Sequence, residues 1–201
     1  GLVVSPLIAL MREQAGKLNA RGVRALSLGG LEPREAQEAL KSFTWSEGPG
    51  FLFTSPERAE TDGLLEHLLR THRSRIALVT IDEAHCVSQW GYDFRPAYKA
   101  LPRFFDRAFG LGGWPPRLCL TATLDSHSEV EVLEDFRLTR DDVIRSTRIV
   151  RDNLHLSCQR FADTNAKLDA LVELLDAHRG DKVIVYAHLK QNRQAGTRAL
   201  A

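Results

Sequence analysis

Short apolar runs alternate along the chain with stretches in which apolar residues recur at helical spacing. The runs predict strands over residues 2–5, 24–28, 50–54, 76–82, 117–121, 143–146, 154–160 and 182–186. The amphipathic stretches predict helices over residues 6–20, 33–43, 63–71, 97–109, 126–136, 165–178 and 190–200. In the helix over 165–178, for example, Leu168, Leu171, Leu174 and Leu175 form one apolar face.

This alternation predicts an α/β fold in which parallel strands are joined by helical crossovers, with helices on both faces of the sheet. The run Ile-Ala-Leu-Val-Thr-Ile at 76–81 is almost continuously apolar, which is typical of a strand buried on both faces. A domain boundary is expected near residue 150, which gives a first lobe over 1–150 and the beginning of a second over 151–201. Some fifty residues bury too little surface to form a large core alone.

Composition narrows the class of protein only slightly. The chain is 43% hydrophobic and 26% charged, with a formal net charge of +1, so charge alone does not indicate a nucleic-acid partner. We expect no membrane association, because no apolar run is long enough to cross a bilayer, and we expect a cytoplasmic location. Cys86, Cys119 and Cys158 are far apart, which favours reduced thiols over a zinc site or disulfides.

The first candidate for chemistry is Asp82-Glu83-Ala84-His85, at the end of the buried run. Ligands of open α/β sheets bind beyond the carboxyl ends of the strands, where Asp82 and Glu83 are predicted to lie. Two adjacent acids there suit nucleotide hydrolysis, with Asp82 holding Mg²⁺ through water and Glu83 orienting or deprotonating the attacking water. The alternative is a strand end capped by solvated acids.

The second candidate is the segment that follows, which combines aromatic and cationic residues without strand or helix periodicity. It reads Cys86-Val87-Ser88-Gln89-Trp90-Gly91-Tyr92-Asp93-Phe94-Arg95-Pro96. Bases stack on aromatic rings for about 1–3 kcal/mol each, and arginine adds phosphate or cation–π contacts. A binding loop for single-stranded nucleic acid is therefore predicted, and packing of Trp90 and Phe94 as a hydrophobic plug is the alternative.

Together these segments resemble superfamily-two helicases, and the aromatic loop resembles that of the RecQ family in particular. Further segments resemble family motifs in the same order: Val4–Met11 motif Ia, Thr54–Arg58 motif Ib, Leu120–Thr123 motif III, Arg151 to Leu154 the start of the second lobe, and Val183–Tyr186 motif IV. The resemblance implies a RecA-like fold and an ATP- and Mg²⁺-dependent motor that moves along single-stranded DNA and unwinds duplex DNA in repair or recombination.

The resemblance also assigns roles to individual residues. Asp82, Glu83 and His85 are expected to be catalytic, with His85 coupling the nucleotide site to Gln89, Thr121 and Thr123. Side chains expected to contact DNA are Ser5, Ser55, Arg58, Trp90, Tyr92, Phe94 and Arg95. For both serines, which precede proline, helix N-capping is an alternative compatible with this role. For Thr123, ordinary strand propensity before a helix start competes with the coupling role.

The chain departs from the family pattern at three places. No Gly-x-x-x-x-Gly-Lys-[Ser/Thr] loop is present, so we expect a fragment whose phosphate loop precedes Gly1. Tyr92 stands where the family usually has histidine, and Ala187-His188-Leu189-Lys190 replaces the usual sequence after Tyr186. Two other functions stay open: an RNA helicase with the same Asp-Glu-Ala-His box, and a degenerate lobe that binds DNA without catalysis.

Overall fold

The structure, a computed structural model, describes residues 1–43, 48–88, 95–146 and 152–186. The chain divides into two compact units, Gly1–Ile144 and Arg145–Ala201. The division falls slightly before the expected boundary at residue 150. Each unit is described separately below, and the identity of the second as the start of a second motor lobe stays a prediction.

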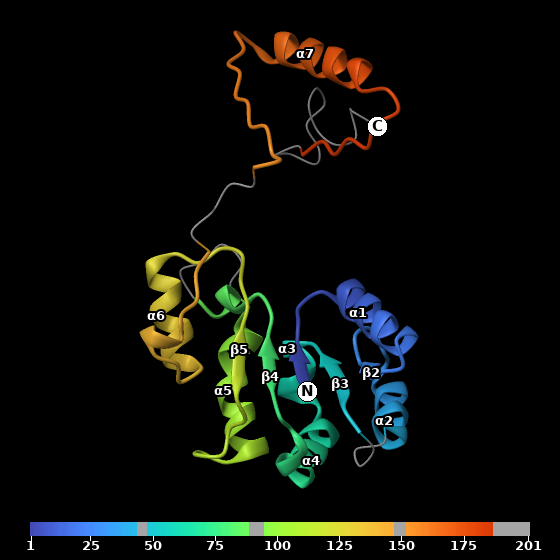
Figure 1. Cartoon of the computed structure of the whole chain (residues 1–201), viewed down its shortest axis with the longest axis vertical. Coiled ribbons are helices and arrows are strands. Elements are labelled where there is room, and N and C mark those ends of the chain that lie inside the picture. Colours follow the sequence, from blue (N-terminus) through green and yellow to red (C-terminus); the bar gives the residue numbers. More distant parts are fainter. Residues whose placement is uncertain (44–47, 89–94, 147–151, 187–201) are drawn as a thin grey trace. The chain divides into compact units, whose positions relative to one another are not determined.

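The first unit is built on a five-stranded parallel sheet with the order β2-β3-β1-β4-β5 (Figure 1). Its strands are β1 (Leu2–Val4), β2 (Arg24–Ser27), β3 (Gly50–Thr54), β4 (Val79–Ile81) and β5 (Arg117–Cys119). In the register, Val4 lies opposite Thr54 on one side and Ile81 on the other. Since all five strands run in the same direction, the segments that follow them meet at one edge, called the carboxyl edge here.

Helices connect these strands, as the alternating pattern predicts. They are α1 (Ile8–Ala20), α2 (Pro33–Ser42), α3 (Pro56–Thr61), α4 (Gly63–Thr71), α5 (Pro96–Phe109) and α6 (Ser126–Asp135), with 3-10 turns η1 (Arg73–Arg75), η2 (Ala84–Val87) and η3 (Arg140–Asp142). Local capping explains several starts. Asp62 and Asp125 accept hydrogen bonds from main-chain N–H groups of α4 and α6, and Glu32 and Glu35 form a capping box on α2.

The sheet separates two apolar clusters, because successive strand residues point to opposite faces. Leu2 and Val4 join the larger cluster, with side chains from α2 through α6, whereas Val3 packs with Met11 and Ala15 of α1 in the smaller one. Each fully buried leucine or phenylalanine contributes roughly 1.5–3 kcal/mol. Helices thus cover both faces, which confirms the predicted α/β class, and this core fixes the carboxyl edge.

Several predicted elements are corrected by the structure. No strand forms at 143–146, 154–160 or 182–186, because none of these described segments pairs with a partner strand, and an apolar run alone cannot supply inter-strand hydrogen bonds. The strand predicted over 76–82 is limited to Val79–Ile81, and Thr80 in its middle is only half-buried, so the strand is not equally buried on both faces. Helix α3 was not predicted, α1 begins at Ile8 rather than Pro6, and the helix predicted over 190–200 lies outside the described residues.

The second unit contains helix α7 (Thr164–Ala177), close to the predicted range. Asp163 caps it by accepting a hydrogen bond from the main-chain N–H of Ala166 at 2.9 Å. None of its residues is fully buried, and Leu174 is 54% exposed, so its apolar face is only partly covered within the described part of this unit.

Candidate functional site

Four strands bring their following residues to the carboxyl edge. Ser5 follows β1, Ser55 follows β3, Asp82 and Glu83 follow β4, and Thr121 follows β5 shortly after its last residue. These positions are up to 116 residues apart in sequence, from 5 to 121, but neighbouring strands place them side by side. The sheet thus gathers the hydroxyl and carboxylate groups that the sequence suggested.

Asp82 accepts three hydrogen bonds, and its own main-chain N–H donates to the Val4 carbonyl at 2.9 Å. Its Oδ2 accepts from the Ser5 hydroxyl at 2.9 Å, its Oδ1 accepts from the main-chain N–H of Glu83 at 3.1 Å, and its carbonyl accepts from the Tyr98 hydroxyl at 2.7 Å. Each carboxylate oxygen has more than one acceptor position, so the group keeps capacity for a hydrated cation. Because Mg²⁺ is usually bound by one or two carboxylates plus water and phosphate oxygens, this donor set fits it.

Tyr98 supports this turn from the core. Its side chain is fully buried, and burial raises the pKa of the phenol far above its ordinary value, with the nearby Cys86 and Asp82 adding to the increase. The phenol therefore stays protonated and donates its hydrogen to the Asp82 carbonyl. Tyrosines buried on an amphipathic helix usually need such a partner, which was the signal in the sequence that could have identified this residue.

Glu83 has a left-handed backbone, with φ 49° and ψ 45°. This region is uncommon for residues other than glycine and costs of order 1–3 kcal/mol at a constrained site. The conformation turns the chain sharply from β4 into η2, and the Glu83 side chain is 35% exposed. The turn thus leaves one carboxylate held by Ser5 and presents the next one partly to solvent.

His85 connects the β4 turn to the segment after β5. Its Nδ1 lies 2.8 Å from Thr121 Oγ1 and 3.4 Å from Glu83 Oε2. The Thr121 hydroxyl donates to the Thr123 carbonyl at 2.8 Å, so it acts as acceptor toward His85. This pattern assigns the proton to Nδ1 of His85. The expected contact of His85 with Thr121 is present, whereas Thr123 takes part through its main chain.

The predicted nucleic-acid loop is only partly described: Gln89, Trp90, Tyr92 and Phe94 lie outside the described residues. Its two ends are joined, since the main-chain N–H of Arg95 donates to the Cys86 carbonyl at 3.0 Å. The Arg95 side chain is 43% exposed, with Nη1 3.7 Å from Glu57 Oε1 on α3. The loop therefore begins and ends beside the Asp82–His85 turn.

The other residues expected at DNA have contacts within the chain. Ser5 is buried and bonded to Asp82, and α1 begins only at Ile8, so the N-cap alternative for Ser5 is wrong. Ser55 does cap α3, accepting from the main-chain N–H of Arg58 at 3.2 Å. The Arg58 guanidinium contacts the Asp62 carboxylate and the Leu31 carbonyl. DNA contacts by these three residues stay predictions.

A second group of aromatic and arginine side chains lies around Trp114. The Arg137 guanidinium stacks 4.0 Å from the Trp114 ring centroid, and the Trp114 indole N–H donates to Asp106 at 2.9 Å. Arg137 also binds both Asp106 oxygens, at 2.7 and 3.0 Å. Phe105 meets the Trp114 ring edge-on, at a centroid distance of 5.3 Å. This group, called the Trp114 cluster here, was not predicted.

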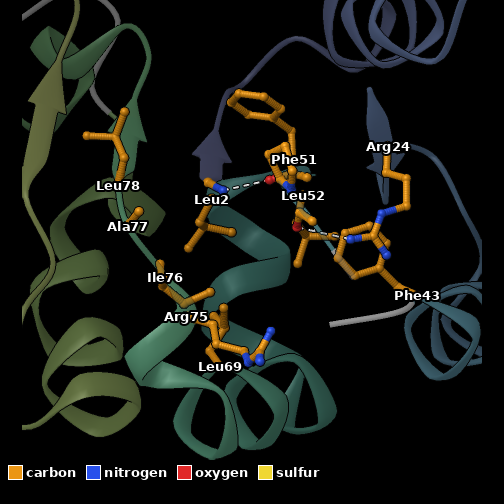
Figure 2. A pocket seen from close by; sticks show the side chains of 14 residues that line it. Leu2, Arg24, Phe43, Phe51, Leu52, Leu69, Arg75, Ile76, Ala77 and Leu78 are labelled. Carbon is orange, nitrogen blue, oxygen red and sulfur yellow. Dashed lines mark hydrogen bonds between the residues drawn. The ribbon is translucent and has the colours of Figure 1, made fainter. Parts of the chain in front are cut away.

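A pocket of about 300 Å³ lies at the opposite end of the sheet, beside the amino ends of β1, β2 and β3. Figure 2 shows Arg24 and Phe43 on one side of it and Ile76 to Leu78 on the other. None of the site residues predicted above lines it, so the pocket is separate from the candidate site. The described residues contain neither a cluster of three or more metal-binding side chains nor a helix of the length and apolarity needed to span a membrane.

Comparisons with known proteins assign the chain to a family. The sequence model described as "DEAD/DEAH box helicase" matches residues 1–132, so the chain belongs to the DEAD/DEAH box helicase family. Within that family it is similar to RecQ-type proteins, which confirms the resemblance seen in the sequence.

Two curated relatives illustrate this similarity. The chain is 34% identical over 184 residues to the probable ATP-dependent DNA helicase RecS of Bacillus subtilis, covering 91% of this chain and 35% of that protein. It is 36% identical over 199 residues to the ATP-dependent DNA helicase RecQ of Haemophilus influenzae, covering 93% and 28%. Among solved structures, it is similar to the Pyrococcus furiosus Hef helicase domain, with a TM-score of 0.46 and 21% identity over 68% of this chain and 26% of that one. The chain thus spans about a third or less of the length of these curated relatives.

Proposed function

We propose that the chain is part of a RecQ-like, ATP-dependent DNA helicase. The observation that carries the proposal is the hydrogen-bonded turn at the carboxyl edge, in which Ser5 orients Asp82 and His85 joins Glu83 to Thr121. The names of the RecS and RecQ relatives, both ATP-dependent DNA helicases, support the same reading. In the proposed enzyme, Mg²⁺-bound ATP supplies the phosphoanhydride whose hydrolysis drives movement.

Asp82 and Glu83 have different proposed roles at the carboxyl edge. Asp82 is proposed to hold the hydrated Mg²⁺, and the Ser5 hydroxyl keeps its carboxylate in one orientation. Glu83, whose side chain is 35% exposed, is proposed to position the attacking water and accept its proton. General-base assistance of this kind contributes about 10²–10⁴ in rate.

His85 is proposed to transmit the state of this site to the segment after β5 through Thr121, 2.8 Å from its Nδ1. Gln89, Trp90, Tyr92, Phe94 and Arg95 are proposed to contact single-stranded DNA. Arg95 is joined to Cys86 at the end of η2, so the proposed DNA loop and the catalytic turn are consecutive parts of one short segment. We further propose a cytoplasmic enzyme, located at the nucleoid in a bacterium.

The test is Glu83→Gln in the full-length enzyme. The amide keeps the size of the side chain but is a very weak base, so we expect ATP turnover to fall at least 100-fold while ATP binding changes less than about threefold. Steady-state ATPase rates and equilibrium nucleotide binding measure the two effects. Near-normal hydrolysis by this variant would refute the assignment.

The wild-type ATPase also separates the alternatives. Stimulation by single-stranded DNA well above that by RNA of the same sequence supports a DNA motor. Equal or stronger stimulation by RNA would favour an RNA helicase, and no hydrolysis at all would favour a non-catalytic binding module.

A further inference from the structure

Four polar side chains, those of Ser88, Lys99, Glu131 and Asp135, form a connected group. Glu131 on α6 accepts a hydrogen bond from the Ser88 hydroxyl at 3.1 Å through Oε1, and its Oε2 lies 2.9 Å from Lys99 Nζ on α5. Lys99 Nζ also lies 2.9 Å from Asp135 Oδ2. One carboxylate therefore connects three segments of the chain.

The two partners of Glu131, Ser88 and Lys99, lie before and after residues 89–94 in the sequence. Ser88 is the last described residue before this segment and is fully buried, while Lys99 lies in the first turns of the helix that follows it. Glu131 itself lies on α6, the helix that follows Thr121. The carboxylate thus links the start of the loop, the helix after the loop, and the segment that contacts His85.

These contacts are strong enough to fix geometry. Hydrogen bonds to charged groups are roughly twice as strong as those between neutral groups. The Lys99 and Glu131 side chains are 32% and 19% exposed, so solvent screens the pair only in part. Burial alone would lower the pKa of Lys99, but hydrogen bonds with Asp135 and Glu131 raise it above its usual value, so the ammonium keeps its charge at neutral pH.

We propose that Glu131 is a positioning residue that holds Ser88 and the first turn of α5 in register with the His85–Thr121 contact, and thereby sets how strongly DNA stimulates ATP hydrolysis. This inference rests on the proposed function. Asp135 shares Lys99 with Glu131, whereas the Ser88 hydroxyl donates to Glu131, so an Asp135 variant shows the effect of losing a carboxylate beside Lys99 alone.

The experiment measures basal and DNA-stimulated ATPase rates in the full-length protein for Glu131→Ala, with Asp135→Ala as matched control. We expect Glu131→Ala to lower the ratio of stimulated to basal rate about tenfold, as expected for losing about 1.4 kcal/mol of coupling, while the basal rate stays within twofold. Asp135→Ala should keep the ratio within twofold. Glu131→Gln retains an acceptor for Ser88 and should fall between Glu131→Ala and wild type.

Ser88→Ala provides a second, independent measurement. If the two side chains act through one contact, adding Ser88→Ala to Glu131→Ala should change the ratio less than twofold further. Full additivity would overturn the proposed bridge. Equal effects of Glu131→Ala and Asp135→Ala would also overturn it, as would equal loss of basal and stimulated rates accompanied by a lower Tm, which indicates a purely structural role.

The wild-type protein separates failure of this inference from failure of the proposed function. Normal DNA stimulation in the wild type with an unchanged ratio in Glu131→Ala and Glu131→Gln refutes the positioning role alone. A wild-type ATPase that does not respond to single-stranded DNA refutes the proposed function, and the positioning role with it.

Discussion

The carboxyl-edge site and the Trp114 cluster both combine charged groups with neighbouring polar or aromatic side chains. They differ in whether the charged groups bind partners within the fold or face solvent. In the Trp114 cluster the indole N–H and the Arg137 guanidinium share the Asp106 carboxylate. At the carboxyl edge, Glu83 occupies a strained backbone conformation and presents its carboxylate partly to solvent. The difference is that the charged and aromatic groups of the Trp114 cluster bind one another, whereas the carboxyl edge leaves a carboxylate partly accessible to a ligand.

The largest effect is expected from Trp114→Ala. Removing the ring eliminates its contacts with Phe105 and Arg137 and its hydrogen bond to Asp106, so we expect a loss of about 3 kcal/mol in unfolding free energy. Chemical denaturation measures this loss. Trp114→Phe, which keeps a ring but not the N–H, should lose less. If the Trp114 cluster is structural, DNA stimulation of the ATPase should be unchanged. A selective loss of stimulation would mean that the cluster takes part in the response to DNA and differs less from the carboxyl-edge site.

A smaller effect is expected from Tyr98→Phe, which leaves the Asp82 carbonyl without its 2.7 Å donor. An unpaired buried acceptor costs about 1–3 kcal/mol, and the turn that carries Asp82 and Glu83 should become less well fixed. We therefore expect both the unfolding free energy and the ATPase kcat to fall. Phe104→Leu, a change in the same helix away from Asp82, should lower stability alone. An unchanged kcat in Tyr98→Phe would mean that this tyrosine contributes only to packing.

The smallest effect is expected from Thr121→Val, which removes the hydroxyl next to His85 but keeps the shape of the side chain. One net hydrogen bond is worth about 1 kcal/mol, so losing the one to His85 should lower the DNA-stimulated ATPase rate of the full-length protein about fivefold. The two hydrogen bonds between this hydroxyl and the Thr123 main chain are lost as well, and their loss should lower local stability. Thr123→Val is the matched control, since Thr123 contacts Thr121 through its main chain. Equal effects of the two variants would contradict the contact seen here.

The sequence predicted the sheet of the first unit and the edge at which Ser5, Asp82 and Thr121 come together, because both follow from local patterns and from the rule for parallel strands. The chemistry proposed at that edge stays a prediction. The contact of His85 with Thr121 came from the family resemblance and is present. The sequence could not show that Ser5 serves Asp82, because this bond joins residues 77 positions apart. The Ser88–Glu131 bond, across 43 positions, was missed for the same reason.

The prediction of strands over 143–146, 154–160 and 182–186 was wrong for a different reason. Their apolar residues suit a pleated surface, but a strand is stabilised by pairing with its neighbours, which a local pattern does not reveal. The Trp114 cluster was not predicted because Trp114 and Arg137 are far apart in the sequence and belong to no short motif. Three of the seven predicted DNA contacts, those of Trp90, Tyr92 and Phe94, lie outside the described residues and stay predictions.

If Glu83 is the general base proposed above, its left-handed conformation sets stability against catalysis at a single position. Glycine or asparagine adopts this conformation with less strain, so replacing Glu83 by either would make the native state more favourable while removing the proposed general base. Selection for thermal robustness alone would therefore drive this position away from glutamate, and its retention would be a signature of selection for turnover.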